Sequence, residues 1–240
     1  MYPRRVTRRI WLPLAIALVA LPASASADSG PYVRVSDERS TTYSAYVEFA
    51  TPVRAGPSFE ERKLANLRPD TFHGRPEVVV VLGYRDVDGR RWLRVRYAGL
   101  GRRVGWAKES AFSASTLRRT LVVVDRDVPE LRLLRGGKVV LRVPVGVGAS
   151  ESPTPAGRYY IRERLALSGT TSIYGALAFG TSAFSRYRTD WPGGGQVGIH
   201  GTNEPGLIPG HISNGCVRLR NENILAVGRR IDVGTPVLIK

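Results

Sequence analysis

The single cysteine of this 240-residue chain is Cys216, in the segment Ser213-Asn214-Gly215-Cys216-Val217-Arg218-Leu219. A lone thiol cannot form an internal disulfide, so in an oxidising compartment its reactivity is the property to explain. The ordinary alternative for an isolated cysteine is a small buried hydrophobic residue. The residues around Cys216 decide between these interpretations.

A thiol that is to attack a carbonyl as the thiolate needs a base to take its proton. Of the three histidines, His73 belongs to the first half of the chain, and His211 follows a Gly- and Pro-containing loop typical of solvent-exposed positions. His200 follows the strand-like residues 196–199, where a rigid strand end would hold its ring. We therefore predict that His200 is the base.

The attack also needs hydrogen-bond donors for the oxyanion. Gly215 allows a tight turn, so the backbone N–H groups of Gly215 and Cys216 are the predicted donors. No acidic residue adjoins His200, so the Gly201 carbonyl is the candidate that orients its ring.

The beginning of the chain predicts an export signal. Residues 1–27 contain four arginines, an apolar run over 10–21 and a small-residue cleavage site, Ala25-Ser26-Ala27. The segment 7–12 resembles a twin-arginine signal, and an uncleaved signal anchor is the alternative. We expect an exported protein of the cell wall or periplasm that meets the membrane only through this segment.

The chain is strongly basic. Its formal charge of +16 would fall to +12 without residues 1–27, because that segment has no acidic residue. Anionic wall polymers or lipids are the expected polyanionic partners of an exported protein, and nucleic acid is not expected. The alternative is that the charge only improves solubility.

Composition and turn signals divide the rest of the chain into two β-rich units. Residues 28–44 are polar and unpatterned and predict a linker, and residues 114–119 predict a short connection. Between them, residues 45–113 contain short strands, including a hairpin with an Asp88-Gly89 turn and an alternating segment over 92–97.

Three segments of the first unit, residues 53–58, 89–95 and 105–107, together resemble a bacterial SH3-like domain. The resemblance implies a small barrel that binds wall peptides. The alternative is a spacer that sets the distance between the second unit and the membrane.

The second unit begins with the run Leu121-Val122-Val123-Val124, which is followed by a hairpin with a Gly136-Gly137 turn. Helical signals are sparse. Residues 221–228 predict one helix, which Asn221 would cap and Gly228 would end, and residues 235–240 predict a terminal strand. The expected fold class is mainly β with few helices.

The motifs of this unit resemble those of L,D-transpeptidase (YkuD-type) catalytic domains. The resemblance rests on His200-Gly201-Thr202 and the segment 213–219, with support from residues 146–148, 152–161 and 174–175, and it covers residues 118–240. It implies a β-rich catalytic fold in which Cys216 is the nucleophile, His200 the proton acceptor and donor, and Gly201 the ring orienter.

The resemblance also implies substrate-binding positions. Arg218 could bind a substrate carboxylate through its guanidinium group. The alternative interpretation is that Arg218 is an ordinary surface arginine. Three further residues match motif positions: Ser213, Asn221 and Tyr174. Of the substrate-binding positions, Ser213 and Asn221 are expected more to support the loop, and Tyr174 is expected near the substrate entrance. Asn214 occupies the position where many members of the family have a second histidine. The effect of this asparagine on substrate binding is an open question.

The implied activity is acyl transfer between the tetrapeptide stems of peptidoglycan through a Cys216 thioester, giving cross-links between third residues. Hydrolysis of the same thioester would make the chain an L,D-carboxypeptidase, and a non-catalytic wall-binding protein is the alternative from another class. A carbapenem is expected to acylate Cys216. No metal or other cofactor is expected, because the sequence has no clustered ligand set and no phosphate-binding glycine loop.

Overall fold

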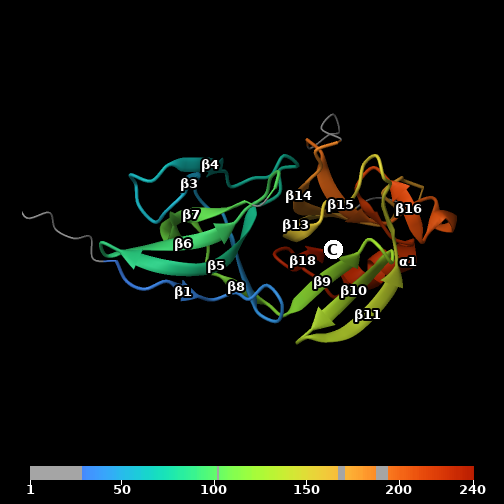
Figure 1. Cartoon of the computed structure of the whole chain (residues 1–240), viewed down its shortest axis with the longest axis horizontal. Helices are drawn as coiled ribbons and strands as arrows, with labels where there is room; N and C mark the ends of the chain where they lie inside the picture. Colours follow the sequence, from blue (N-terminus) through green and yellow to red (C-terminus); the bar gives the residue numbers. More distant parts are fainter. Residues whose placement is uncertain (1–28, 102, 167–170, 188–193) are drawn as a thin grey trace, which may run out of the picture.

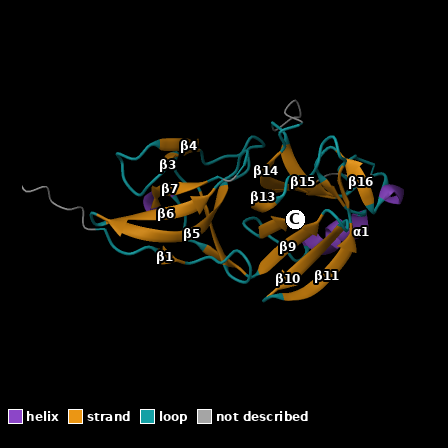
Figure 2. Cartoon of the chain, in the orientation of Figure 1, coloured by secondary structure: helices purple, strands orange, loops and turns teal. Residues whose placement is uncertain are grey.

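The computed structural model describes residues 29–101, 103–166, 171–187 and 194–240, which form two β-sheets side by side (Figure 1). Strands dominate, and α1 (Asn221–Gly228) is the one α-helix in these ranges (Figure 2). The prediction of a mainly β chain is confirmed. No helix in these ranges is long and apolar enough to cross a bilayer. The predicted export signal lies outside the described residues.

The first sheet has eight strands in the order β4-β3-β7-β6-β5-β2-β8, with β1 paired to β5. The Asp88-Gly89 turn joins β5 to β6, and its two residues have φ values of 50° and 69°, as a two-residue hairpin turn requires. The strand bounds are β1 (Val33–Arg34), β2 (Thr42–Tyr46), β3 (Thr51–Arg54), β4 (Lys63–Leu67), β5 (Val78–Val87), β6 (Arg90–Arg96), β7 (Val104–Lys108) and β8 (Thr116–Arg118); the 3₁₀ helix η1 (Glu109–Ala111) follows β7.

The linker prediction for residues 28–44 is wrong where the chain joins this sheet. Strands β1 and β2 both pair with β5, and β8, in the predicted connection, pairs with β2. The polar side chains of these segments do not show the alternating hydrophobic pattern that predicts a strand. Ser36 and Thr42 are buried, and Ser36 Oγ donates a hydrogen bond to the Val81 carbonyl.

The alternation expected over 92–97 is also only partly right, because both faces of β6 are covered. Trp92 packs edge-on against Phe59 with ring centroids 5.1 Å apart. Arg96 is buried and forms a bidentate pair with Glu38, with nitrogen-to-oxygen distances of 2.7 and 2.9 Å. A buried ion pair between a strand residue and the distant segment between β1 and β2 cannot be inferred from a period of two.

The second sheet has ten strands in the order β11-β10-β9-β18-β13-β14-β15-β17-β12-β16. Its core includes Phe179, Ile199, Val217 and, from α1, Ile224. The predicted glycine-turn hairpin and terminal strand are present. The strand bounds are β9 (Thr120–Asp125), β10 (Glu130–Arg135), β11 (Lys138–Pro144), β12 (Gly146–Gly148), β13 (Gly157–Ala166), β14 (Leu177–Phe184), β15 (Gln196–His200), β16 (Gly210–Ser213), β17 (Val217–Arg218) and β18 (Pro236–Ile239); the 3₁₀ helix η2 (Pro205–Leu207) precedes β16.

Strand β13 also connects the two sheets. Tyr160 is fully buried and its hydroxyl donates to the Val78 carbonyl of β5 at 3.0 Å. Two positions further, Arg162 pairs with Glu77 through its Nε at 2.8 Å and through a second contact from its Nη2. Alternate residues of β13 therefore contact the first sheet, while the strand itself pairs with β14 and β18 of the second sheet.

Candidate active site around Cys216 and His200

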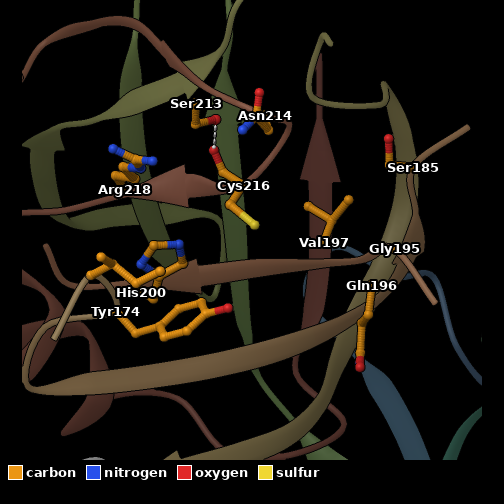
Figure 3. Close-up of a pocket in the computed structure, with 11 residues that line it drawn as sticks. Tyr174, Ser185, Gly195, Gln196, Val197, His200, Ser213, Asn214, Cys216 and Arg218 are labelled. Carbon is orange, nitrogen blue, oxygen red and sulfur yellow. Dashed lines mark hydrogen bonds between the residues drawn. The ribbon is translucent and has the colours of Figure 1, made fainter. Parts of the chain in front are cut away.

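Strand pairing brings the predicted base and nucleophile to one face of the second sheet. Strands β15 and β17 are parallel, with Ile199 opposite Val217 and His200 opposite Arg218. Side chains alternate along a strand, so the buried Ile199 and Val217 point into the core. His200 and Arg218 lie on the other face, and Figure 3 shows the Cys216 thiol and the His200 ring directed into the same pocket.

Glycine keeps the space beside the thiol open. The Gly198 N–H donates to Cys216 Sγ at 3.3 Å. A Cβ at Gly198 would lie 3.4 Å from His200 Cδ2 and 3.8 Å from Cys216 Sγ. Burial raises the pKa of the Cys216 thiol, and the opposing effects of the Gly198 N–H and the Arg218 charge are smaller. The resting sulfur is therefore a protonated thiol at neutral pH.

The His200 ring is fixed in one tautomer. Its Nδ1 lies 2.6 Å from the Gly201 carbonyl oxygen, which can only accept, so Nδ1 carries the proton. Nε2 is then the nitrogen that can take a proton. Tyr174 packs edge-on against the ring with centroids 5.0 Å apart. Burial lowers the pKa of His200 to about 4, so the resting imidazole is neutral.

The loop before Cys216 is held by Ser213. Its hydroxyl donates to the Cys216 carbonyl at 2.5 Å and accepts from the Gly215 N–H at 3.1 Å. Gly215 has a φ of 111°, a conformation that requires glycine. The Gly215 N–H could therefore donate to an oxyanion only by giving up its bond to Ser213. The Cys216 N–H stays the predicted donor.

Arg218 lies at the edge of the site beside the exposed Asn214, and both line the pocket that contains Cys216. The guanidinium has a carboxylate partner, because its Nη1 lies 3.2 Å from Glu204 Oε2. Its buried Nε has no protein partner among the described residues. Arg218 is thus not an ordinary exposed arginine, and Glu204 is a partner that the motif did not reveal.

Asn221 serves the loops behind the site rather than the helix end or the pockets. No side chain caps α1, for which Arg220 is the N-cap residue. The Asn221 amide instead accepts from the Ala176 and Thr202 N–H groups and donates to the Thr202 carbonyl. The helix cap expected of Asn221 is therefore absent, and its contacts support the segment after His200.

Two cavities meet at the thiol, and Tyr174, Gln196, His200 and Cys216 line both. The first cavity, of about 80 Å³, also contains Ser213, Asn214 and Arg218. The second cavity, of about 300 Å³, extends over Gly198 and Gly180 to Glu163 and His73. The arrangement can receive two groups beside one thiol.

Of the other histidines, His211 is exposed and its Nε2 lies 3.0 Å from the Arg126 carbonyl oxygen, outside both cavities. His73 lines the second cavity although it belongs to the first unit, between β4 and β5. No local sequence signal indicates this placement or that of Glu163, because their contact joins residues 90 positions apart. In the described ranges, no three His, Cys, Asp or Glu residues form a cluster that could hold a metal ion.

Comparison with known proteins identifies the second unit. The family model of the L,D-transpeptidase catalytic domain (YkuD) matches residues 119–239. "Putative L,D-transpeptidase YqjB" of Bacillus subtilis (strain 168) is 30% identical over 128 residues, covering 49% of this chain and 69% of that protein. "Putative L,D-transpeptidase YkuD" of the same organism is 29% identical over 118 residues, covering 49% of this chain and 64% of that protein.

Among solved structures, Bd1075 of Bdellovibrio bacteriovorus is 28% identical with a TM-score of 0.40, and the match covers 51% of this chain and 48% of that chain. This chain thus spans about half the length of that protein and somewhat under two thirds of the second Bacillus relative. The family model covers half of the chain and includes both His200 and Cys216. The chain belongs to the YkuD family of L,D-transpeptidase catalytic domains.

Proposed function

We propose that this chain is an exported cysteine acyltransferase that cross-links peptidoglycan stem peptides between third residues. The observation that carries the proposal is the shared face of β15 and β17, where Cys216 lies beside a His200 ring whose Nδ1 is bound to the Gly201 carbonyl. This is the arrangement of a nucleophile, a base and an orienting acceptor.

The first step forms a thioester. His200 Nε2 takes the proton of the thiol as Sγ attacks the carbonyl of the third residue in a donor tetrapeptide stem, and the Cys216 N–H is the donor to the oxyanion. When the intermediate collapses, the carbon–nitrogen bond to the terminal D-alanine breaks. The His200 imidazolium gives its proton to that leaving amine, so His200 returns to its neutral form.

The second step transfers the acyl group. An amine of a neighbouring stem attacks the thioester, His200 takes the proton that the amine loses, and the carbon–sulfur bond breaks. The proton then returns to the Cys216 sulfur. The neutral resting pair suits both steps, because His200 must start each one able to accept a proton.

Arg218 is the proposed binding group for a carboxylate of the donor, because it lines the first cavity and already holds the Glu204 carboxylate. Tyr174 and Asn214 are proposed to contact the donor there.

Each segment of the chain has a separate proposed role. Residues 118–240 are the catalytic domain, residues 1–27 an export signal, and residues 45–113 an SH3-like module that binds wall peptides or acts as a spacer. The basic charge is proposed to favour anionic wall polymers.

The test is to incubate the purified protein with disaccharide tetrapeptide and to analyse the products by mass spectrometry. Transfer gives free D-alanine and cross-linked dimers, whereas a carboxypeptidase gives D-alanine and tripeptide monomers alone. Cys216→Ala should give neither product. If the native protein also gives neither while both proteins bind wall material equally, the chain is a wall-binding protein and the proposal fails.

A further inference from the structure

A basic cavity lies at the junction between the two sheets, away from the thiol. Strand β8 of the first sheet leads directly into β9 of the second sheet (Figure 1), and the residues where they meet line a cavity of about 360 Å³. None of its lining residues belongs to either cavity beside Cys216. Its charged lining residues are Arg118, Arg119, Arg135, Arg230 and Asp232.

Positive charge dominates this cavity, because four guanidinium groups and one carboxylate line it. Within the part of the chain that the structure describes, none of the four arginines forms an ion pair with Asp232 or with another acidic residue. The buried arginines between the sheets differ in this respect, since Arg96 pairs with Glu38 and Arg162 with Glu77. The charge of this cavity is therefore available to a ligand.

Two of the four guanidinium groups are held in place by backbone carbonyls. Arg118 is half-buried, and its Nε donates to the Val233 carbonyl at 2.9 Å. The Arg230 Nη1 donates to the Ala226 carbonyl of α1 at 2.7 Å. A guanidinium has five N–H donors, so both groups keep donors for a ligand. Because these side chains are ordered before binding, less conformational entropy is lost when a ligand binds.

The other two guanidinium groups, of Arg119 and Arg135, are exposed. Their backbones are adjacent, because Arg135 is paired with Thr120 and the Gly136 N–H donates to the Arg119 carbonyl at 3.4 Å. The cavity is thus open to solvent on the side of the β9–β10 pair. It can receive a group that stays attached to a larger molecule.

The side chains of this cavity favour a phosphate group. All its cations are arginines, and the planar guanidinium fork pairs with two oxygens of an oxyanion. A tetrahedral phosphate presents oxygens in several directions and can contact more than one fork, whereas the two oxygens of a carboxylate lie in one plane. Of the described residues that line the cavity, only Leu117 is apolar, and it is half-buried. The cavity therefore has no exposed apolar side chain that could enter a lipid surface.

We propose that this cavity binds the phosphate groups of an anionic wall polymer, a chain of phosphodiesters. The inference rests on the proposed function, because an exported wall enzyme is the kind of protein that meets such a polymer. The polymer contacts both sheets, since Arg118 belongs to β8 and Arg135 to β10. Binding there holds the protein at the wall and leaves both cavities at Cys216 free for stem peptides.

The test measures the binding of fluorescently labelled poly(glycerol phosphate) to the purified protein by anisotropy at constant ionic strength. Arg119→Gln/Arg135→Gln removes two exposed guanidinium groups and should leave the fold intact. We expect this variant to raise the dissociation constant of the polymer roughly tenfold, because charge-assisted hydrogen bonds are lost. Inorganic phosphate should displace the polymer from the native protein, and chloride at the same ionic strength should not.

Arg62→Gln/Arg75→Gln is the matched control. It removes the same charge from two exposed positions outside this cavity and outside both cavities at Cys216. Its dissociation constant for the polymer should stay within about twofold of the native value. An equal loss in the two double variants, or equal displacement by chloride and by phosphate, would mean that the whole basic surface binds the polymer and would overturn the inference.

Two further probes separate the sources of phosphate. The inference is overturned if phosphatidylglycerol vesicles bind through Arg119 and Arg135 while the polymer does not, or if inorganic phosphate alone binds. The proposed function is tested separately by D-alanine release from tetrapeptide, which Arg119→Gln/Arg135→Gln should keep within about twofold of the native rate. Cys216→Ala should bind the polymer as the native protein does, so loss of acyl transfer and loss of polymer binding are distinguishable.

Discussion

The backbone N–H of Gly198 donates a hydrogen bond to Cys216 Sγ at 3.3 Å, across the junction between β15 and β17. This donor and the nearby Arg218 charge favour the thiolate, but burial has the larger effect and raises the pKa of the thiol above its ordinary value of 9.0. In the proposed mechanism, the Cys216 nucleophile is thus a thiol at rest and becomes a thiolate only as His200 takes its proton.

The pH dependence of alkylation tests this state. In the native protein, the rate of Cys216 modification by iodoacetamide should still rise with pH at 9, because the thiolate fraction is still increasing. Arg218→Gln should move the curve to higher pH by removing a favourable charge. A plateau near neutral pH would show that a thiolate–imidazolium pair exists at rest, contrary to the geometry described.

A second prediction concerns His200 and stability. Its pKa is about 4 in the folded protein and 6.5 in the ordinary unfolded reference, so the unfolded chain binds the proton first as the pH falls. Between pH 7 and pH 4, the native protein should lose about 3 kcal/mol more unfolding free energy than His200→Asn. Urea unfolding at both pH values measures this difference. Equal losses would mean that the ring is protonated in the folded state.

A third prediction concerns Glu204, whose Oε2 lies 3.2 Å from Arg218 Nη1. In the proposed binding mode, a donor carboxylate has to replace Glu204, whose side chain is 56% exposed, so the competition is weak. Glu204→Gln should lower the KM for tetrapeptide about two- to fivefold without raising kcat. Glu222→Gln removes the same charge from the exposed start of α1 and is the control. A higher KM in Glu204→Gln would mean that Glu204 positions Arg218 rather than competing for it.

A fourth prediction concerns Asn221, whose amide makes three hydrogen bonds to the segments at 176 and 202. Asn221→Ala should lower the unfolding free energy by about 1–3 kcal/mol, because buried backbone groups lose their partners. It should also lower kcat by loosening the chain next to Gly201. Thermal unfolding and turnover measure both effects. Unchanged stability would show that water or neighbouring groups replace the amide.

Local patterns predicted much of the fold. The Asp88-Gly89 and Gly136-Gly137 turns, the helix at 221–228 and the final strand are present because each depends on residues adjacent in sequence. The strands at 33–34 and 42–46 were missed because the segment that contains them is polar, and its buried Ser36 bonds to the distant Val81 carbonyl. The same reason hides the Arg96–Glu38 pair.

The motif placed the centre of the candidate site but not its surroundings. It indicated Cys216, His200 and the Gly201 contact, since these residues lie in short segments that strand pairing joins. It could not indicate that Glu204 pairs with Arg218 or that His73 of the first unit contacts Glu163. The cap prediction for Asn221 came from the helix pattern and was wrong, because an asparagine at the start of a helix is typical of a cap whatever its tertiary contacts are.

The proposed function requires above all that the Cys216 sulfur receives the acyl group. The direct measurement is the intact mass of the protein after incubation with a carbapenem, followed by peptide mapping. We predict a gain of one drug mass on the peptide that contains Cys216, and no gain in Cys216→Ala. An adduct that persists in Cys216→Ala, or that maps to another residue of the native protein, would contradict the account.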